Sequence, residues 1–282
     1  MSGGLAPAPF VVGVGRSGTT LLRLMLDAHP QLAIGPETQF VADLIGADDP
    51  VQAIIDARTW ADFGLDANEF RRRAAGADLA GVLRAFYSLY AESQTKSRWG
   101  EKTPGYVKAM DSIAGVLDEA RFIHLIRDGR DVALSRRARG MGADKPMAKT
   151  ANLWRRRIED ARGQAGELDG RYLELRYEDL VADPEPHLRR ICEFIELDFD
   201  PAMLSHAEGA GERLSELGSL EAEGGRQARD ADERATAHAR AKEPATTART
   251  GAWRTEMSLD DRREFEEVAG PLLRDLGYDL LS

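Results

Sequence analysis

The sequence predicts an α/β fold in which a central parallel β-sheet is flanked by helices. Apolar runs of strand length alternate along the chain with segments whose leucines recur at helical spacing. A glycine-rich turn joins the first of these strands to the first helix. Strands alternating with helices favour a parallel sheet, because each crossover helix returns the chain to the same edge. We therefore expect residues 1–282 to form a single domain, with helices on both faces of the sheet.

The N-terminal part of this sheet is predicted first. Residues 10–12 are apolar and open a strand that ends at a glycine. A helix should begin at Thr19, because leucines at helical spacing follow it, and it should stop before Pro30. Residues 31–34 are a short apolar run that closes on Gly-Pro, which predicts a second strand.

The later strands follow the same logic. Residues 98–104 are read as the end of a strand and a loop, and residues 121–127 are the clearest buried strand in the chain. A turn and a helix from Asp131 come next. Residues 171–175 form another strand, and a Pro-Glu-Pro start signal at residue 184 predicts the helix that follows.

Two segments carry less pattern than the rest. Residues 38–98 mix helical spacing with aromatic side chains, and we expect a helical insertion over the sheet that walls an acceptor site. The aromatic residues there fit either an apolar acceptor or core packing. Residues 208–247 are rich in Ala, Glu, Arg and Gly, so they are expected to bury little and to form a mobile loop, a surface helix or a lid. A closing helix should start after Ser258.

Charge and cysteine content restrict the function classes. The net charge is -10, which argues against nonspecific binding to nucleic acid or to anionic membranes. Arginine clusters at residues 71–73, 136–137 and 155–157 are expected to be solvated helix faces. The single cysteine, Cys192, lies in an apolar helical stretch and should be a core thiol. No leader pattern or membrane span is visible, so a cytoplasmic location is expected.

The strongest motif is the turn at residues 13–20, between the first strand and the first helix. Glycines let such a turn aim backbone N–H groups inward, and the helix N-terminus adds its positive dipole end. The turn matches the phosphate-loop pattern G-x-x-x-x-G-K-[ST] except that Thr19 replaces the lysine. That lysine serves phosphoryl transfer, so a kinase or ATPase is disfavoured, and Arg16 supplies the cation instead.

This loop resembles the 5′-phosphosulfate loop of the sulfotransferases that use 3′-phosphoadenosine 5′-phosphosulfate (PAPS). The resemblance implies a phosphate-loop-like fold and a set of donor-binding residues, namely Arg16, Ser17, Gly18, Thr19, Thr20 and Leu21. A second family motif, which holds the 3′-phosphate, matches Arg127 and Ser135. An arginine fork and a hydroxyl suit a phosphate, and such a site would tell PAPS from ATP. A structural ion pair between Arg127 and Asp131 is the alternative.

Residues on the acceptor side resemble the protein-tyrosine sulfotransferase branch and its bacterial relatives. The resemblance implies that Glu37 is the catalytic base and that Lys102, with Arg16, stabilises charge on the departing 5′-phosphate. Glu37 could instead cap a helix, and Lys102 could be a surface lysine. His29 and His124 are rival bases, although both are expected to be mainly structural. Weaker matches place Tyr177 and Arg249 near the nucleotide.

These motifs predict an enzyme. We expect transfer of a sulfuryl group from PAPS to the hydroxyl of a small-molecule or peptide acceptor, without a metal, leaving adenosine 3′,5′-bisphosphate (PAP). The alternatives are a nucleotide-dependent small-molecule kinase and a non-catalytic module that senses PAPS or PAP. Glu37 and Lys102 discriminate against the module, because a sensor needs neither a base nor a cation for a leaving group.

Overall fold

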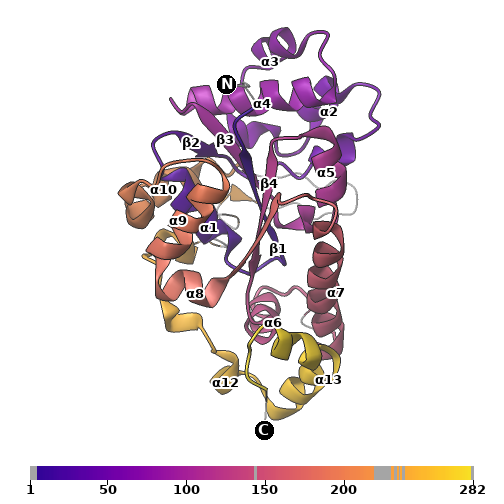
Figure 1. Cartoon of the computed structure of the whole chain (residues 1–282), viewed down its shortest axis with the longest axis vertical. Helices are drawn as coiled ribbons and strands as arrows, with labels where there is room; N and C mark the ends of the chain where they lie inside the picture. Colours follow the sequence, from indigo (N-terminus) through magenta and orange to yellow (C-terminus); the bar gives the residue numbers. More distant parts are fainter. Residues whose placement is uncertain are drawn as a thin grey trace.

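The structure, a computed structural model, describes residues 5–142, 145–218, 230–231, 234, 236 and 239–280. A five-stranded parallel sheet lies at its centre, with the strand order β2-β3-β1-β4-β5 (Figure 1). The strands are β1 (Ala8–Gly13), β2 (Leu32–Ile34), β3 (Arg98–Lys102), β4 (Ala120–Ile126) and β5 (Tyr172–Arg176). The predicted fold class is therefore confirmed, with each expected strand present within a few residues of its predicted position.

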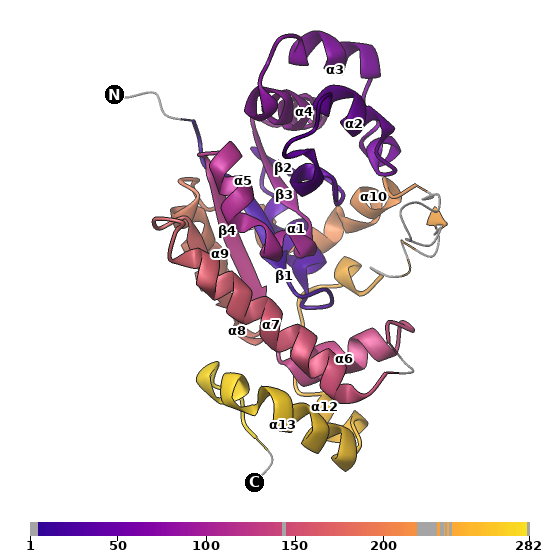
Figure 2. The ribbon, with the colours of Figure 1, turned by 90° about the vertical axis from the view of Figure 1, so that its right-hand side faces the viewer.

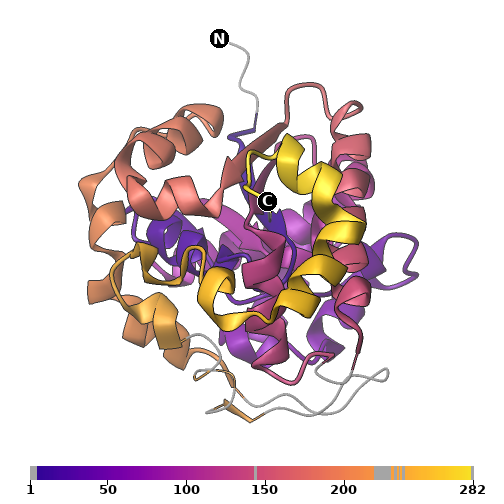
Figure 3. The ribbon, with the colours of Figure 1, turned by 90° about the horizontal axis from the view of Figure 1, so that it is seen from below.

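Helices cover both faces of the sheet, as Figures 1 and 3 show. One layer contains α1 (Thr19–Asp27), α8 (Tyr177–Ala182), α9 (Pro184–Phe194) and α10 (Ala210–Ser215). The other contains α5 (Met110–Val116), α7 (Met147–Ala165) and α13 (Leu259–Asp275). The carboxyl edge carries α6 (Gly129–Arg137) and α12 (Trp253–Glu256). Short 3₁₀ turns complete the described chain: η1 (Val41–Leu44), η2 (Trp60–Phe63), η3 (Pro104–Lys108), η4 (Pro201–Glu208), η5 (Ala239–Lys242) and η6 (Thr247–Arg249).

Strand β1 shows why the central strands read as continuous apolar runs. Phe10 and Val12 face one hydrophobic cluster, whereas Val11 between them faces a second cluster on the other side of the sheet. All three side chains are fully buried. A strand covered on both faces has no solvent-facing positions, so it shows no polar alternation.

The predicted helical insertion consists of α2 (Pro50–Asp56), α3 (Ala67–Ala74) and α4 (Leu79–Ser93), which lie together at one end of the molecule (Figure 2). Its aromatic residues form part of the core. Phe63 and Phe86 have ring centroids 4.9 Å apart, and Tyr87 stacks on Trp99 of β3 at 4.6 Å. These rings anchor the insertion to the sheet, so of the two uses left open by the sequence, core packing accounts for them.

The segment 208–247, which is expected to form a mobile loop, a surface helix or a lid, lies partly outside the described residues. Its described portions are joined to the core by ion pairs. Arg213 of α10 contacts Asp27 at 2.6 Å, and Arg234 contacts Asp62 at 2.6 Å with both groups buried. This segment has few apolar residues, and its charged side chains anchor it by pairing with buried carboxylates from distant parts of the sequence.

No helix in the described part of the chain is long and apolar enough to cross a bilayer. Cys192 is a buried core thiol, as predicted, and burial raises its pKa to about 11.

The carboxyl ends of the parallel strands bring the predicted site residues to one edge of the sheet. Strand β1 leads into the phosphate loop, β2 precedes Glu37, β3 ends on Lys102 and β4 precedes Arg127. Tyr177 directly follows β5. Ligands of open α/β sheets bind at this edge, so the fold itself assembles the candidate site.

Candidate functional site

The phosphate loop depends on a glycine where the helix begins. Gly18 is the N-cap of α1 and has a φ of 94°, a left-handed conformation that favours glycine. A Cβ at this position would lie 2.4 Å from Cδ2 of Tyr177, so the ring of Tyr177 packs directly against the loop. The expectation that Tyr177 lies near the nucleotide gains this geometric support, because its ring forms one wall of the loop.

The loop contains polar groups that suit an anion. The side chain of Ser17 is fully buried, and its Oγ has no hydrogen-bond partner in the described structure. A buried hydroxyl without a partner costs free energy unless a ligand satisfies it. Thr19 is also buried, and the first N–H groups of α1 have no partner within the helix. Loop and helix end therefore fit the 5′-phosphosulfate group of PAPS.

Arg127 and Ser135, the residues of the second motif, lie beside Arg16 of the phosphate loop. Arg16 Nε donates to Ser135 Oγ at 3.1 Å, so the two predicted donor-binding motifs meet. The Arg127 guanidinium lies 4.6 Å from the ring centroid of Tyr177. Arg127 is also 3.7 Å from Asp131, but this contact is long and Asp131 accepts better hydrogen bonds from the backbone of Gly251 and Trp253. Arg127 Nε is buried without a hydrogen-bond partner among the described residues, and a bound phosphate would supply that partner.

The structure does not bring the Arg249 side chain to this site. The Arg249 guanidinium pairs with Glu256, with Nη2 2.8 Å from Oε2, and only its backbone carbonyl reaches the site, where it accepts from Arg127 Nη2 at 2.8 Å. A sequence match gives the position of an arginine but not the direction of a long side chain, and here a nearby carboxylate on α12 sets that direction.

The prediction of solvated helix faces is correct for Arg71, Arg72 and Arg73, which are exposed on α3. It is wrong for Arg136. Arg136 is half-buried, and its Nη1 lies 3.9 Å from where a Cβ on Gly15 of the phosphate loop would be. Neighbouring side chains on a helix point in different directions, so one arginine of the charged run on α6 can face the phosphate loop.

Glu37 and Lys102 form an ion pair at the carboxyl edge. Lys102 Nζ donates to Glu37 Oε1 at 2.6 Å, although the two residues are far apart in the sequence. Lys102 is only 3% exposed, so it is not a surface lysine. Burial lowers the pKa of Lys102, and the charge of Glu37 counteracts this shift. The N-cap of the next described helical turn, η1, is Phe40 and not Glu37. The pair places a carboxylate and a cation side by side, and Lys102 lies opposite Val11 of β1, the strand that leads into the phosphate loop.

A second carboxyl group lies behind this pair. Glu101 is 2% exposed and accepts hydrogen bonds from Thr103 Oγ1 at 2.6 Å and Tyr87 Oη at 2.9 Å. Its carboxyl also interacts with the backbone N–H of Thr38, the residue that follows Glu37. Burial raises the pKa of Glu101 to about 7, against the opposing effect of these donors. Nothing in the sequence marks Glu101 as buried, because it precedes a lysine and resembles an ordinary charged pair.

The raised pKa of Glu101 predicts a pH-dependent stability difference. Because the folded protein holds this proton more tightly than the unfolded chain, the contribution of Glu101 to stability is present below its ordinary pKa and is lost as pH rises through about 7. In Glu101→Gln the side chain stays neutral. We therefore expect the unfolding free energy of the variant, relative to wild type, to increase between about pH 5 and about pH 8 in urea titrations.

Glu119→Gln is the control for this experiment. Glu119 is also buried, but it is paired with Arg84 through contacts of 2.7 and 2.9 Å. Its loss should destabilise the protein wherever that pair is charged. If the two variants changed stability with pH in the same direction, the assignment of a proton to Glu101 would be wrong.

The rival bases have structural partners. His29 Nδ1 accepts from the backbone N–H of Gln31 at 3.1 Å, so Nε2 carries the proton and donates to the carbonyl of Asp198 at 3.0 Å. His124 lies in the middle of the sheet, bonded to Tyr172 Oη at 2.6 Å, and burial lowers its pKa to about 4. Both contacts bind these rings into the fold, as expected of structural histidines.

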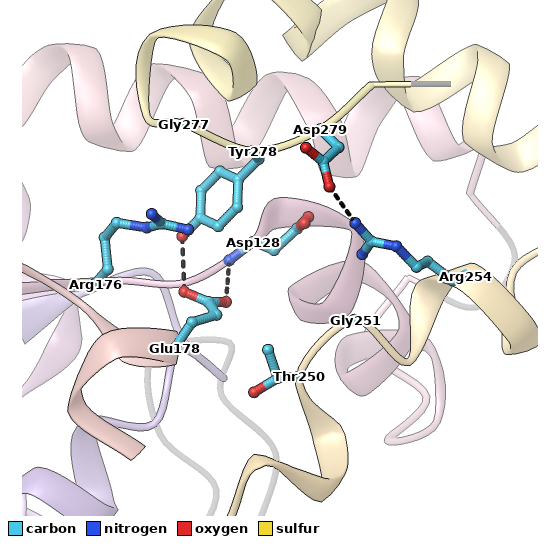
Figure 4. A pocket seen from close by; sticks show the side chains of 9 residues that line it. All are labelled: Asp128, Arg176, Glu178, Thr250, Gly251, Arg254, Gly277, Tyr278 and Asp279. Atoms are coloured by element: carbon cyan, nitrogen blue, oxygen red, sulfur yellow. Dashed lines mark hydrogen bonds and ion pairs between the residues drawn. The ribbon is translucent and has the colours of Figure 1, made fainter. Parts of the chain in front are cut away.

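A polar pocket of about 170 Å³ lies behind the Arg127 turn (Figure 4). Within it, the Glu178 carboxylate accepts from the backbone N–H of Asp128 at 3.0 Å and from Tyr278 Oη at 2.9 Å. Arg254 pairs with Asp279 across the pocket at 2.6 Å. These groups satisfy one another, and their effect is to hold the turn that carries Arg127 against β5 and the C-terminal segment.

A second cavity, of about 210 Å³, lies between the insertion and the residues that follow Glu37. Gln39 lines it and also donates through Nε2 to Glu37 Oε2 at 3.3 Å, so the cavity is one side chain away from the ion pair. The lining is mixed, with apolar and charged members: Thr38, Gln39, Phe40, Asp43, Leu44, Ala53, Asp56, Ala57, Arg58 and Thr59.

Comparisons with known proteins agree with this geometry. A family model described as "Sulfotransferase family" matches residues 7–201. Protein-tyrosine sulfotransferase 1 of Danio rerio is 28% identical over 97% of this chain and 72% of its own length. The sulfotransferase domain of the Synechococcus PCC 7002 olefin synthase has a TM-score of 0.62, with 23% identity over 98% of this chain and 96% of that one. The sulfotransferase domain from the curacin biosynthetic pathway has a TM-score of 0.63, with 18% identity over 98% and 99% of the two chains. Both structures are similar to this chain in fold.

Proposed function

Because the chain belongs to the sulfotransferase family, we propose that it transfers the sulfuryl group of PAPS to an acceptor hydroxyl by in-line displacement. The observation that supports this most strongly is the ion pair of Glu37 and Lys102 beside the phosphate loop. Such a transfer needs a base for the attacking hydroxyl and a cation for the departing phosphate oxygen. A PAPS-sensing module would need neither, and the family assignment disfavours the kinase.

In the proposed reaction Glu37 is the base. The acceptor oxygen attacks sulfur and forms a new S–O bond, its proton passes to a Glu37 carboxylate oxygen, and the bond between sulfur and the 5′-phosphate oxygen breaks. As Glu37 becomes neutral, Lys102 loses its counterion. Its charge is then available to the oxygen that leaves with PAP, and Arg16 adds a second cation there. The paired geometry therefore couples proton uptake to stabilisation of the leaving group.

The remaining predicted residues would hold the donor. Ser17, Thr19, Thr20 and the backbone of Gly18 and Leu21 would contact the 5′ end of the donor, with Arg16 at the mouth of the loop. Arg127 and Ser135 would hold the 3′-phosphate, with charge-assisted bonds from the guanidinium. The buried Ser17 Oγ and Arg127 Nε, which have no hydrogen-bond partners in the described structure, support both assignments.

The acceptor is proposed to enter from the insertion side. The cavity lined by Gln39 opens next to Glu37, and the insertion provides its outer wall. Similarity to protein-tyrosine sulfotransferases makes a phenolic hydroxyl in a tyrosine-containing peptide the first acceptor to test. A small phenol such as 4-nitrophenol is the second, since the mixed lining suits either.

Calorimetric titration of PAP tests the donor site directly. We expect PAP to bind wild type more tightly than AMP or ATP with magnesium, because only PAP carries a 3′-phosphate. In Arg127→Ala the PAP affinity should fall about 100-fold, since two charge-assisted hydrogen bonds are lost. The affinity for AMP should change little.

Arg121→Ala is the matched control for this titration. Arg121 lies at the opposite end of β4 from Arg127, where it donates to the backbone carbonyls of Asp118 and Ala120. Its replacement should leave PAP binding unchanged. Equal or tighter binding of ATP with magnesium to the wild-type protein would reject the sulfotransferase proposal.

A further inference from the structure

Arg136 is a half-buried cation that has no counterion among the described residues. Its Nε is buried and has no hydrogen-bond partner, and no ion pair joins its side chain to any residue within the described ranges. Its neighbours on α6 differ. Arg137 pairs with Asp261 at 2.7 Å, and Arg130 pairs with Asp128 at 2.8 Å. An arginine removed from water normally acquires a carboxylate partner, because an unpaired buried charge is costly.

The position of Arg136 relates it to the phosphate loop. Its Nη1 lies 3.9 Å from the place of a Cβ on Gly15, so the guanidinium stands against the loop backbone. The preceding residue, Ser135, already accepts a hydrogen bond from Arg16 Nε at 3.1 Å. Arg136 and Arg16 therefore approach the same part of the loop from two sides, one from α6 and one from the loop itself.

Burial lowers the pKa of Arg136, and no carboxylate within the described ranges counteracts this shift. Arg157 of the neighbouring helix α7 is another cation, and its pKa is lowered by burial and in part by the charge of Arg136. A negatively charged ligand near Arg136 would offset both the burial of its charge and this repulsion.

We propose that Arg136 is an additional donor-binding residue, which pairs with a phosphate oxyanion of PAPS at the mouth of the phosphate loop. This inference rests on the proposed function, because it takes PAPS as the ligand. It adds a cation that the predicted motifs do not include. The guanidinium acts on the bound nucleotide and has no part in proton transfer.

Titrations of PAP and AMP into Arg136→Gln test the proposal, with Arg137→Gln as the control that removes the same charge one residue away. We expect Arg136→Gln to weaken PAP binding roughly tenfold, and Arg137→Gln to leave it within about twofold of wild type. Loss of both PAP and AMP affinity would place the contact at the 5′ end, and loss of PAP affinity alone would place it at the 3′-phosphate. Either result supports the proposal.

Thermal unfolding with and without PAP supplies a second readout. Because no described residue pairs with the Arg136 side chain, Arg136→Gln should leave the Tm of the free protein unchanged or raise it, while the Tm increase caused by PAP becomes smaller. A lower Tm of the free protein with an unchanged PAP shift would show a structural role and overturn the inference.

Unchanged PAP and AMP affinity would also overturn the inference, even if turnover of an anionic acceptor fell, since the oxyanion would then belong to the acceptor. Failure of the wild-type protein to bind PAP would instead reject the proposed function. The two failures are therefore distinguishable.

Discussion

Glu37→Gln should lower kcat by about 10²- to 10⁴-fold while PAP affinity stays within about twofold of wild type. Glutamine has the shape of glutamate but cannot accept the proton of the attacking hydroxyl. Glu37 accepts hydrogen bonds from Lys102 and Gln39 and is proposed to act on the acceptor hydroxyl, so we expect donor binding to depend little on it. The rate is measured as PAP released from PAPS with a tyrosine-containing peptide or 4-nitrophenol, and the affinity is measured by calorimetry.

The same substitution removes the counterion of Lys102, and this second effect can be separated by pH. Burial already lowers the pKa of Lys102, and loss of the Glu37 charge would lower it further. If the activity loss came from deprotonation of Lys102, activity would recover as pH falls. A lost base gives no such recovery, so a rate in Glu37→Gln that rises toward acid pH would contradict the role assigned to Glu37.

The fold and the location of the site could be predicted because their signals are local. Strands covered on both faces are apolar without interruption, and the loop at residues 13–20 combines glycines with a strand before it and a helix after it. The spacing of Arg127 and Ser135 within their motif also predicted that both residues belong to one site. Glu37 and Lys102 follow different strands, and parallel topology places the ends of those strands together.

What the sequence could not give depends on side-chain directions and distant partners. Arg249 fits a motif, yet Glu256 draws its guanidinium away from the site. Arg136 belongs to a charge run that resembles a solvated surface, although the turn of α6 directs it at the loop. Glu101 looks like half of a local charge pair and is buried only because α4 covers β3. The direction of Arg249 follows from a carboxylate nearby in the sequence, whereas the other two facts follow from packing between segments far apart in the chain.

Arg130 shows how such packing supports the site. It is fully buried, with Nε and Nη2 bonded to the two oxygens of Asp128 at 3.0 and 2.8 Å and Nη1 bonded to Glu266 at 2.6 Å. Its guanidinium carbon lies 3.5 Å from the ring centroid of Trp253. One side chain thus joins the turn after Arg127, the closing helix α13 and the start of α12. It lies in the motif between Arg127 and Ser135, but it faces away from the donor.

Arg130→Met should therefore reduce the free energy of unfolding by about 3–5 kcal/mol, because the buried Asp128 carboxylate loses its hydrogen bonds with the Arg130 guanidinium. Arg137→Met is the control. Its pair with Asp261 is partly exposed, with side-chain exposures of 36% and 23%, and its loss should cost less than about 1 kcal/mol. Urea unfolding measures both. Equal losses in the two variants would mean that the ion pairs of Arg130 contribute no more than an ordinary surface pair. The expected difference, together with weaker PAP binding in Arg130→Met, would show that this buried arginine holds the geometry of the turn after Arg127.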